Sequence, residues 1–80
     1  MNVGEVVKQR LLDLCQERGI TINKLANISG VTQSTLNNII SGRNNSATVA
    51  TIKKLCDGLG ITLADFFDTF EFNSLDQEIQ

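Results

Sequence analysis

The sequence has no histidine, tryptophan, tyrosine or proline, and it has only two cysteines. Without histidine or a CxxC pair, it has no cluster of residues that would hold a metal ion. It also lacks a glycine-rich phosphate loop and paired carboxylates on one predicted face, so we expect neither an enzyme nor a cofactor. Cys15 and Cys56 fall at apolar positions of predicted helices. We expect both to be buried free thiols in a reducing compartment.

Long apolar runs are also missing. No run exceeds three residues, whereas about 20 are needed to cross a bilayer. No basic segment followed by an apolar one marks a secretory signal. These absences predict a cytoplasmic protein without membrane contact. The 80 residues, 41% of them hydrophobic, are enough for one small domain that buries about 60–65% of its unfolded surface.

Basic residues are few, and their distribution is uneven. The net charge is −2, yet residues 65–80 carry five acidic residues and no lysine or arginine. Residues 1–64 carry seven basic and four acidic residues, which gives a net charge of +3. We therefore expect a mildly basic domain over residues 1–68 and an acidic tail over residues 69–80. This is a weak electrostatic footprint for DNA binding.

Helical periodicity dominates the rest of the chain. Apolar residues recur at 3.6-residue spacing over residues 3–18, with inner positions Val3, Val7, Leu11, Leu14 and Cys15. Further helices are predicted at residues 22–28, 33–41, 49–59 and 63–67. Threonines at 21, 32, 48 and 62 are the expected N-caps, and glycines at 19, 30, 42 and 60 the expected ends or turns. The prediction is an all-α fold of five helices.

The predicted core uses one face of each later helix. Ala26 is small enough for two helices to cross closely, and Val31 packs the turn between the second and third helices into the core. The expected inner residues are Ile22, Leu25, Ala26, Leu36, Ile39, Ile40, Val49, Ile52, Leu55, Cys56, Leu59, Leu63, Phe66 and Phe67.

The acidic tail contains apolar residues with two readings. Phe70, Phe72, Leu75 and Ile79 either pair with a second copy of the chain or fold back on the first helix. Leu75 and Ile79 lie four residues apart, which is compatible with a last short helix. The alternative is a frayed terminus.

Residues 21–42 read as a helix-turn-helix with the second helix, residues 33–41, as the reader. One side of that helix is apolar, and the other carries the small polar residues Gln33, Ser34, Asn37 and Asn38. Amides pair bidentately with adenine, and hydroxyls pair with several base edges. We expect an A·T-leaning site with Gln33 and Asn38 as main readers. The alternative is a solvated helix surface.

Phosphate contacts need positive charge or N–H groups at helix starts. Arg43 is the strongest candidate, whereas Lys53 and Lys54 are expected to be solvated. Lys8, Arg10 and Arg18 have no predicted partner. The full set of predicted phosphate-contacting residues is Asn23, Lys24, Thr32, Thr35, Arg43, Asn44 and Asn45.

Two segments carry a family resemblance. They are T-x-x-x-L-A-x-x-S-G-V-T-Q-S-T-L-x-x-I-x-S-G-R from Thr21 and T-x-x-T-I-x-K-L-C-x-x-L-G-I-T-L-x-D-F-F from Thr48. With them the chain resembles Cro/repressor-type (XRE-like) helix-turn-helix regulators of bacteria and their phages. The resemblance implies a compact five-helix, lambda-repressor-like domain that binds operator DNA, commonly as a dimer. The chain departs from the family pattern at Ile22, where glutamine is common, and at Ala47, where proline is common.

The resulting hypothesis is a sequence-specific DNA-binding transcriptional regulator, a repressor of bacterial or prophage origin. Its expected partners are double-stranded operator DNA and a second copy of the chain, with no small-molecule ligand. The alternative is a protein-interaction module of the same fold, such as an antitoxin or a phage accessory protein, with weak or no DNA binding.

Overall fold

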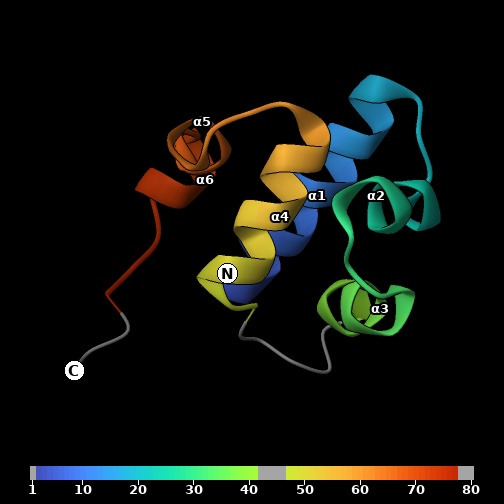
Figure 1. Cartoon of the computed structure of the whole chain (residues 1–80). Coiled ribbons are helices and arrows are strands. Elements are labelled where there is room, and N and C mark those ends of the chain that lie inside the picture. The colour runs from blue at the N-terminus through green and yellow to red at the C-terminus, as the bar shows by residue number, and fades with distance from the viewer. Residues whose placement is uncertain (1, 42–46, 78–80) are drawn as a thin grey trace.

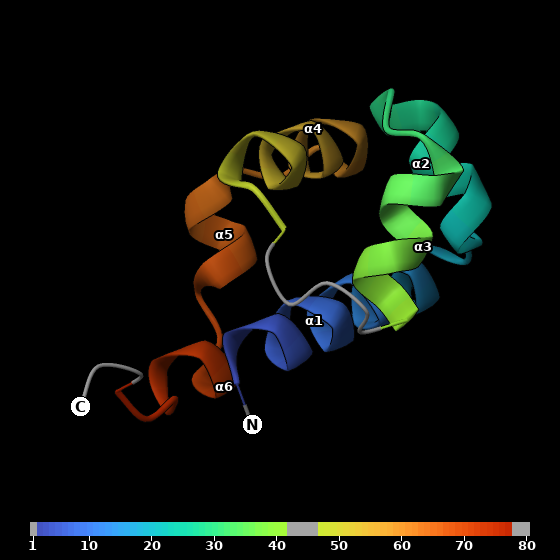
Figure 2. The same ribbon diagram turned by 90° about the horizontal axis from the view of Figure 1, so that it is seen from below.

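Six helices and no strand make up the part of the chain that the computed structural model describes, residues 2–41 and 47–77 (Figure 1). Helices α1 and α4 form the centre, with α2 and α3 on one side and α5 and α6 on the other (Figures 1 and 2). The predicted all-α fold is confirmed, and a sixth short helix follows the expected five. The helices are α1 (Val3–Arg18), α2 (Ile22–Ser29), α3 (Gln33–Ser41), α4 (Val49–Leu59), α5 (Leu63–Phe67) and α6 (Phe70–Asn73). None of them is long and apolar enough to span a membrane.

The predicted threonine N-caps are confirmed. The hydroxyl oxygens of Thr21 and Thr62 each accept the N–H three residues later at 3.0 Å, and those of Thr32 and Thr48 do so at 3.1 Å. Each cap satisfies one of the N–H groups that a helix start leaves unpaired. Gly30 makes the turn after α2 with a φ of 67°, and the next N–H, of Val31, donates to the Ala26 carbonyl at 3.1 Å. Predicted residue Gly42 lies outside the described residues.

The core agrees with the predicted inner faces except at two helix starts. Val3 is 38% exposed and Val49 is 67% exposed, so both core predictions were wrong. Each is the first residue of its helix, and helical side chains point back toward the N-terminus, here into solvent. Val6 is instead buried at 3% exposure. The largest fully buried residues are Phe66, Leu11, Leu25, Leu36, Leu55 and Cys56.

Helices α2 and α4 cross at Ser29 and Gly58. A Cβ atom at position 58 would lie 3.1 Å from the Cα of Ser29 and would also collide with its hydroxyl. The crossing therefore depends on glycine at this position. The Ser29 hydroxyl is buried there and has no hydrogen-bond partner among residues 2–41 and 47–77. Ala26, the predicted small residue, is also buried at 1% exposure.

Two arginines of α1 bind the carboxyl ends of other helices. Nε of Arg10 donates to the Phe66 carbonyl and Nη2 to the Asp65 carbonyl, each at 2.9 Å. The Arg10 guanidinium also lies 5.9 Å from the centre of the Phe66 ring. Arg18 donates to the Leu59 carbonyl at the end of α4. These cations satisfy carbonyls that the helix ends leave unpaired and complement the helix dipoles.

The tail folds back in part. Thr69 caps α6 by accepting the Phe72 N–H at 3.3 Å. The Phe72 ring packs against Phe67, with centroids 4.9 Å apart, and against Phe66 at 6.0 Å. Phe70 is 81% exposed. The tail helix therefore lies before Leu75, which is half-buried outside any helix, and Ile79 lies outside the described residues.

Candidate nucleic-acid interface

Helix α3 has one buried side and one polar exposed side. Leu36 is 0% exposed and Ile39 is 7% exposed, and both belong to the core. The four predicted base readers, by contrast, are all exposed: Gln33, Ser34, Asn37 and Asn38. In the view from below, no other helix lies in front of α3 (Figure 2). The four residues therefore share one face of α3 that the described helices leave uncovered.

The side chains of this face make no hydrogen bond with any other described residue. The Ser41 hydroxyl donates a hydrogen bond to Asn38, but the acceptor is the Asn38 backbone carbonyl and not its side-chain amide. The amides and the hydroxyl thus keep their donors and acceptors for a ligand. A surface amide bonded within the protein would have to give up that bond before it could read a base.

Thr32 and Thr35 form a hydroxyl pair at the start of α3. Thr32 Oγ1 accepts the Thr35 N–H at 3.1 Å, and the two hydroxyl oxygens lie 2.8 Å apart, within hydrogen-bond distance. Each hydroxyl has one hydrogen, so the contact between them uses one of the two hydrogens and leaves the other for an outside acceptor. Both threonines are exposed. The pair of predicted phosphate ligands therefore offers one hydroxyl donor.

The remaining predicted phosphate ligands divide into two groups. Asn23 and Lys24 are exposed in the first turn of α2, where Thr21 caps the Lys24 N–H. Their side chains are available to a ligand on the outside of the helix. The other three, Arg43, Asn44 and Asn45, lie outside the described residues.

Several basic side chains serve the fold or a neighbouring acid. Arg10 and Arg18 bind backbone carbonyls, and Lys53 forms an ion pair with Asp57 on the surface of α4. The i,i+4 spacing of Lys53 and Asp57 is a signal that sequence reasoning missed. No sequence signal pairs Arg10 with Phe66, because they are 56 positions apart. Lys24 and Lys54 remain as exposed cations among the described residues.

The described residues bring neither a metal site nor a reactive thiol to this face. Within residues 2–41 and 47–77, no group of three potential metal ligands comes together. Cys15 and Cys56 are buried free thiols, as predicted. Burial raises the pKa of the Cys15 thiol. Burial, with a smaller contribution from the Asp57 carboxylate, also raises the pKa of Cys56 against the opposing effects of Lys53 and Arg10.

The sequence profile of the Cro/C1-type HTH DNA-binding domain matches residues 10–71. The chain belongs to this family. The Cro/C1-type match confirms the family resemblance and supports a DNA-binding regulator. A solved structure described as "Crystal structure of the prophage Lp1 protein 11" is 39% identical in sequence, with a TM-score of 0.83. The match covers 92% of this chain and 97% of that one. Comparison with curated proteins gave no match.

Proposed function

We propose that this Cro/C1-type domain is a sequence-specific transcriptional repressor that reads operator DNA with α3 in the major groove. One observation carries the proposal. Gln33, Ser34, Asn37 and Asn38 are exposed, and their side chains make no hydrogen bond with another described residue, on a helix whose other side is held by the core. The helix is therefore fixed while its polar side chains are available. The 39% identity to a prophage protein supports a phage-derived regulator.

The chemistry of the face favours A·T-containing sites. Glutamine and asparagine pair bidentately with N6 and N7 of adenine, and each good pair discriminates by about 1–3 kcal/mol. The described part of α3 has no arginine or lysine, so the commonest guanine contact is missing. Gln33 and Asn38 are the proposed main readers, with Ser34 and Asn37 beside them.

Affinity has to come from the phosphate contacts. The Thr32–Thr35 pair has one hydroxyl hydrogen available, and Asn23 and Lys24 are exposed at the start of α2. Arg43 is the proposed main cation, with Asn44 and Asn45 beside it. Each charged contact adds about 0.9 to the slope of log affinity against log salt. With so few cations, a shallow salt dependence is expected.

A single helix-turn-helix offers a small interface. Two copies bound to half-sites about one helical turn apart would double the contacts, and this spacing follows from the pitch of B-DNA. We therefore propose that the domain binds its operator as a homodimer. A two-fold symmetric consensus would support the pairing.

Selection from random double-stranded DNA tests the proposal directly. The expected result is a two-fold symmetric, A·T-leaning consensus that shifts the protein in a gel at moderate salt. A guanine-rich consensus at the α3 half-sites would contradict the assigned readers. Absence of any enriched sequence at low salt would contradict DNA reading itself and point to a protein-binding role for the fold.

A further inference from the structure

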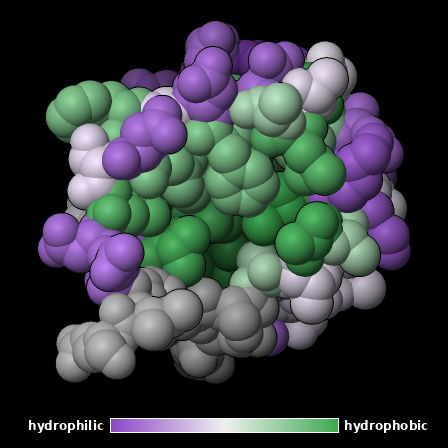
Figure 3. All heavy atoms as spheres, turned by 90° about the vertical axis from the view of Figure 1, so that its left-hand side faces the viewer, coloured by the Kyte–Doolittle hydropathy of each residue, from purple (hydrophilic) through white to green (hydrophobic). Residues whose placement is uncertain are grey.

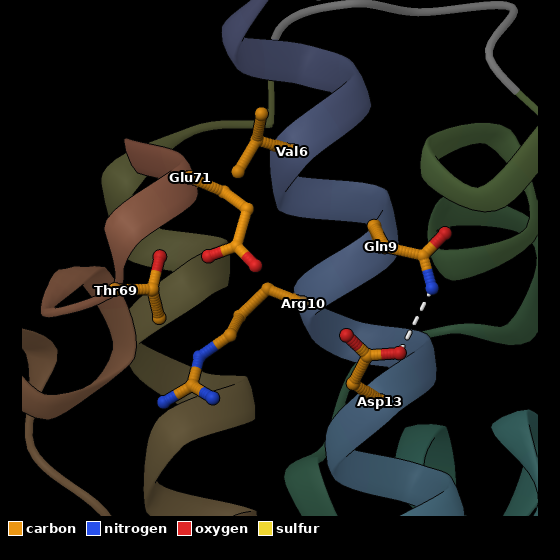
Figure 4. Close-up of a pocket in the computed structure, with 6 residues that line it drawn as sticks. All are labelled: Val6, Gln9, Arg10, Asp13, Thr69 and Glu71. Carbon is orange, nitrogen blue, oxygen red and sulfur yellow. Dashed lines mark hydrogen bonds between the residues drawn. The ribbon is translucent and has the colours of Figure 1, made fainter. Parts of the chain in front are cut away.

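A groove runs between α1 and α6, away from α3. It consists of two hollows of about 90 Å³ and 250 Å³, and both are lined by Val6 and Glu71. Figure 4 shows the smaller hollow, with α1 supplying one wall and the start of α6 the other. The two hollows together are called the α1–α6 groove. Its α1 wall includes Val6 and Asp13, and its other wall includes Phe70, Glu71, Leu75 and Asp76.

The groove has an apolar floor and an exposed aromatic rim. Val6 is 3% exposed at the bottom, Leu75 is half-buried, and Phe70 is 81% exposed. Phe66 and Phe72, by contrast, pack inward. On the side of the molecule that carries α5 and α6, apolar side chains gather around a hollow, with hydrophilic residues around them (Figure 3). Phe70 is the most exposed large apolar residue in the described part of the chain.

Three carboxylates face this groove, and none of them forms an ion pair with a cation of the described residues. Asp13 accepts a hydrogen bond from Gln9 Nε2 at 2.8 Å, and Glu71 and Asp76 line the other wall. Among the described residues, the ion pair within 4 Å is Lys53–Asp57 on α4. The one cation of the groove, Arg10, has its guanidinium directed onto the carbonyls of α5. The groove therefore presents net negative charge around apolar side chains.

Charge decides among the possible occupants. DNA is repelled by the carboxylates, and a second copy of the groove would bring two acidic rims together at close range. A partner with lysine or arginine would be attracted instead. Each of the two hollows, at about 90 Å³ and 250 Å³, is smaller than the roughly 300–1,000 Å³ of small-molecule pockets, so each suits one side chain of a peptide.

We propose that the α1–α6 groove docks a short basic segment of another protein. An apolar side chain of that segment lies against Phe70 and Leu75 above Val6, and its lysines or arginines face Glu71, Asp76 and Asp13. Helix α3 lies on the other side of the α1–α4 centre from α6 (Figures 1 and 2). The domain can therefore hold DNA and this segment at the same time, and the proposal does not depend on the DNA-binding one.

The test is a titration of the ¹⁵N-labelled full chain with three synthetic peptides, followed by amide chemical shifts. One peptide carries a central leucine flanked by lysines. The second replaces the lysines with glutamates, and the third replaces the leucine with serine. The first peptide alone should shift the amides of Val6, Gln9 and residues 70–75, and its affinity should fall at least about fivefold from low to high salt. Equal shifts with either control peptide would overturn the proposal.

Matched variants locate the contact. Phe70→Ser and Glu71→Gln should each lower the affinity for the first peptide about fivefold or more. Two control variants should leave that affinity unchanged. They are Ile28→Ser, at a 45% exposed apolar site on α2, and Glu17→Gln, at an exposed acid elsewhere on α1. The mutated side chains are exposed or half-buried at most, so unchanged melting temperatures are expected throughout. Equal weakening by the controls would overturn the assigned site.

Two further measurements separate the alternatives. Concentration-dependent shifts of the same amides without peptide would assign the groove to a second copy and overturn the proposal. Gel shifts with operator DNA should be the same for wild type, Phe70→Ser and Glu71→Gln. Loss of DNA binding in these two variants would indicate that the groove is part of the DNA-binding surface, and it would count against the proposal. Failure of the wild type to bind any DNA would contradict the repressor function alone.

Discussion

The last residue of α2, Ser29, rests on Gly58 of α4 so closely that a Cβ atom at position 58 would lie 3.1 Å from the Ser29 Cα. The turn to α3 begins at the next residue, Gly30. The α2–α4 crossing therefore determines where the chain leaves for α3. A change at position 58, on a helix that carries no base reader, should affect DNA reading through this contact.

Gly58→Ala should lower the free energy of unfolding by about 1–3 kcal/mol, because the added methyl group forces the crossing apart. Alanine in place of glycine usually stabilises a helix by about 0.5–1 kcal/mol. The sign of the change is thus diagnostic. Chemical denaturation measures it, and the double variant Gly58→Ala, Ser29→Ala should recover part of the loss. A stabilised Gly58→Ala protein would contradict the close crossing.

Ser29→Ala should raise the free energy of unfolding by about 1 kcal/mol, because it removes a buried hydroxyl that has no hydrogen-bond partner in the described part of the chain. Ser34→Ala is the matched control on the exposed side of α3. The control should change stability by less than about 0.5 kcal/mol. Thermal denaturation of both variants measures the difference, and a destabilised Ser29→Ala would indicate that the hydroxyl has a partner in solution.

Arg10→Met should lower the free energy of unfolding by about 1–2 kcal/mol through loss of the bonds to the Asp65 and Phe66 carbonyls. It should leave the salt dependence of DNA binding unchanged, because this guanidinium serves the end of α5. Lys24→Ala is the comparison, and its salt slope should fall by about 0.9. Equal salt slopes in both variants would contradict the assignment of Arg10 to the fold and of Lys24 to a phosphate contact.

Gln33→Ala should weaken binding to the selected operator by about 1–3 kcal/mol and leave binding to unrelated DNA unchanged. The expected loss is confined to the base pairs that this side chain reads. Arg43→Ala should weaken binding to all sequences alike and lower the salt slope by about 0.9. Gel shifts on operator and scrambled DNA at several salt concentrations separate the two patterns. A uniform loss in Gln33→Ala would remove it from the readers.

The two buried thiols predict a fall in stability at alkaline pH. Burial raises the pKa of Cys15 and Cys56 in the folded state. The unfolded chain, with thiol pKa values of about 8.5, therefore loses its thiol protons first as the pH rises. The contribution of the two thiols to the free energy of unfolding should be fully present below that pH. It should decline above it, until the folded thiols also ionise. Denaturation from neutral to alkaline pH measures the decline, which should be smaller in the double variant Cys15→Ala, Cys56→Ala.

At neutral pH, an aromatic disulfide reagent should leave both thiols of the folded protein unmodified.

Local signals in the sequence were sufficient to predict the first five helices. Threonine caps and apolar spacing act within a few residues, so the roles of Thr21, Thr32 and Gly30 could be assigned from their sequence neighbours alone. End effects were missed, as at Val49, because the apolar period does not tell whether a helix has a preceding turn to pack its first side chain. The exposed α3 face follows from the same period.

Contacts between distant segments could not be predicted. The Arg10–Phe66 bond, the fit of Ser29 on Gly58 and the α1–α6 groove all join residues brought together by the packing of separate helices. The packing of Phe72 against Phe66 and Phe67 could not be predicted either. Folding back and pairing with a second copy of the chain are compatible with the same sequence pattern. The base and phosphate contacts stay predictions, since their partner is DNA.

The absence of internal bonds on the α3 face has a consequence for how this protein can change over generations. Gln33, Ser34, Asn37 and Asn38 hold no side-chain bond with the described part of the chain, whereas the core contacts of α3 come from Leu36 and Ile39. Mutations at the four positions are therefore close to neutral for folding and free to alter the preferred operator. New binding preferences can accumulate at these positions without compensating substitutions elsewhere, so related domains can diverge in target while keeping one scaffold.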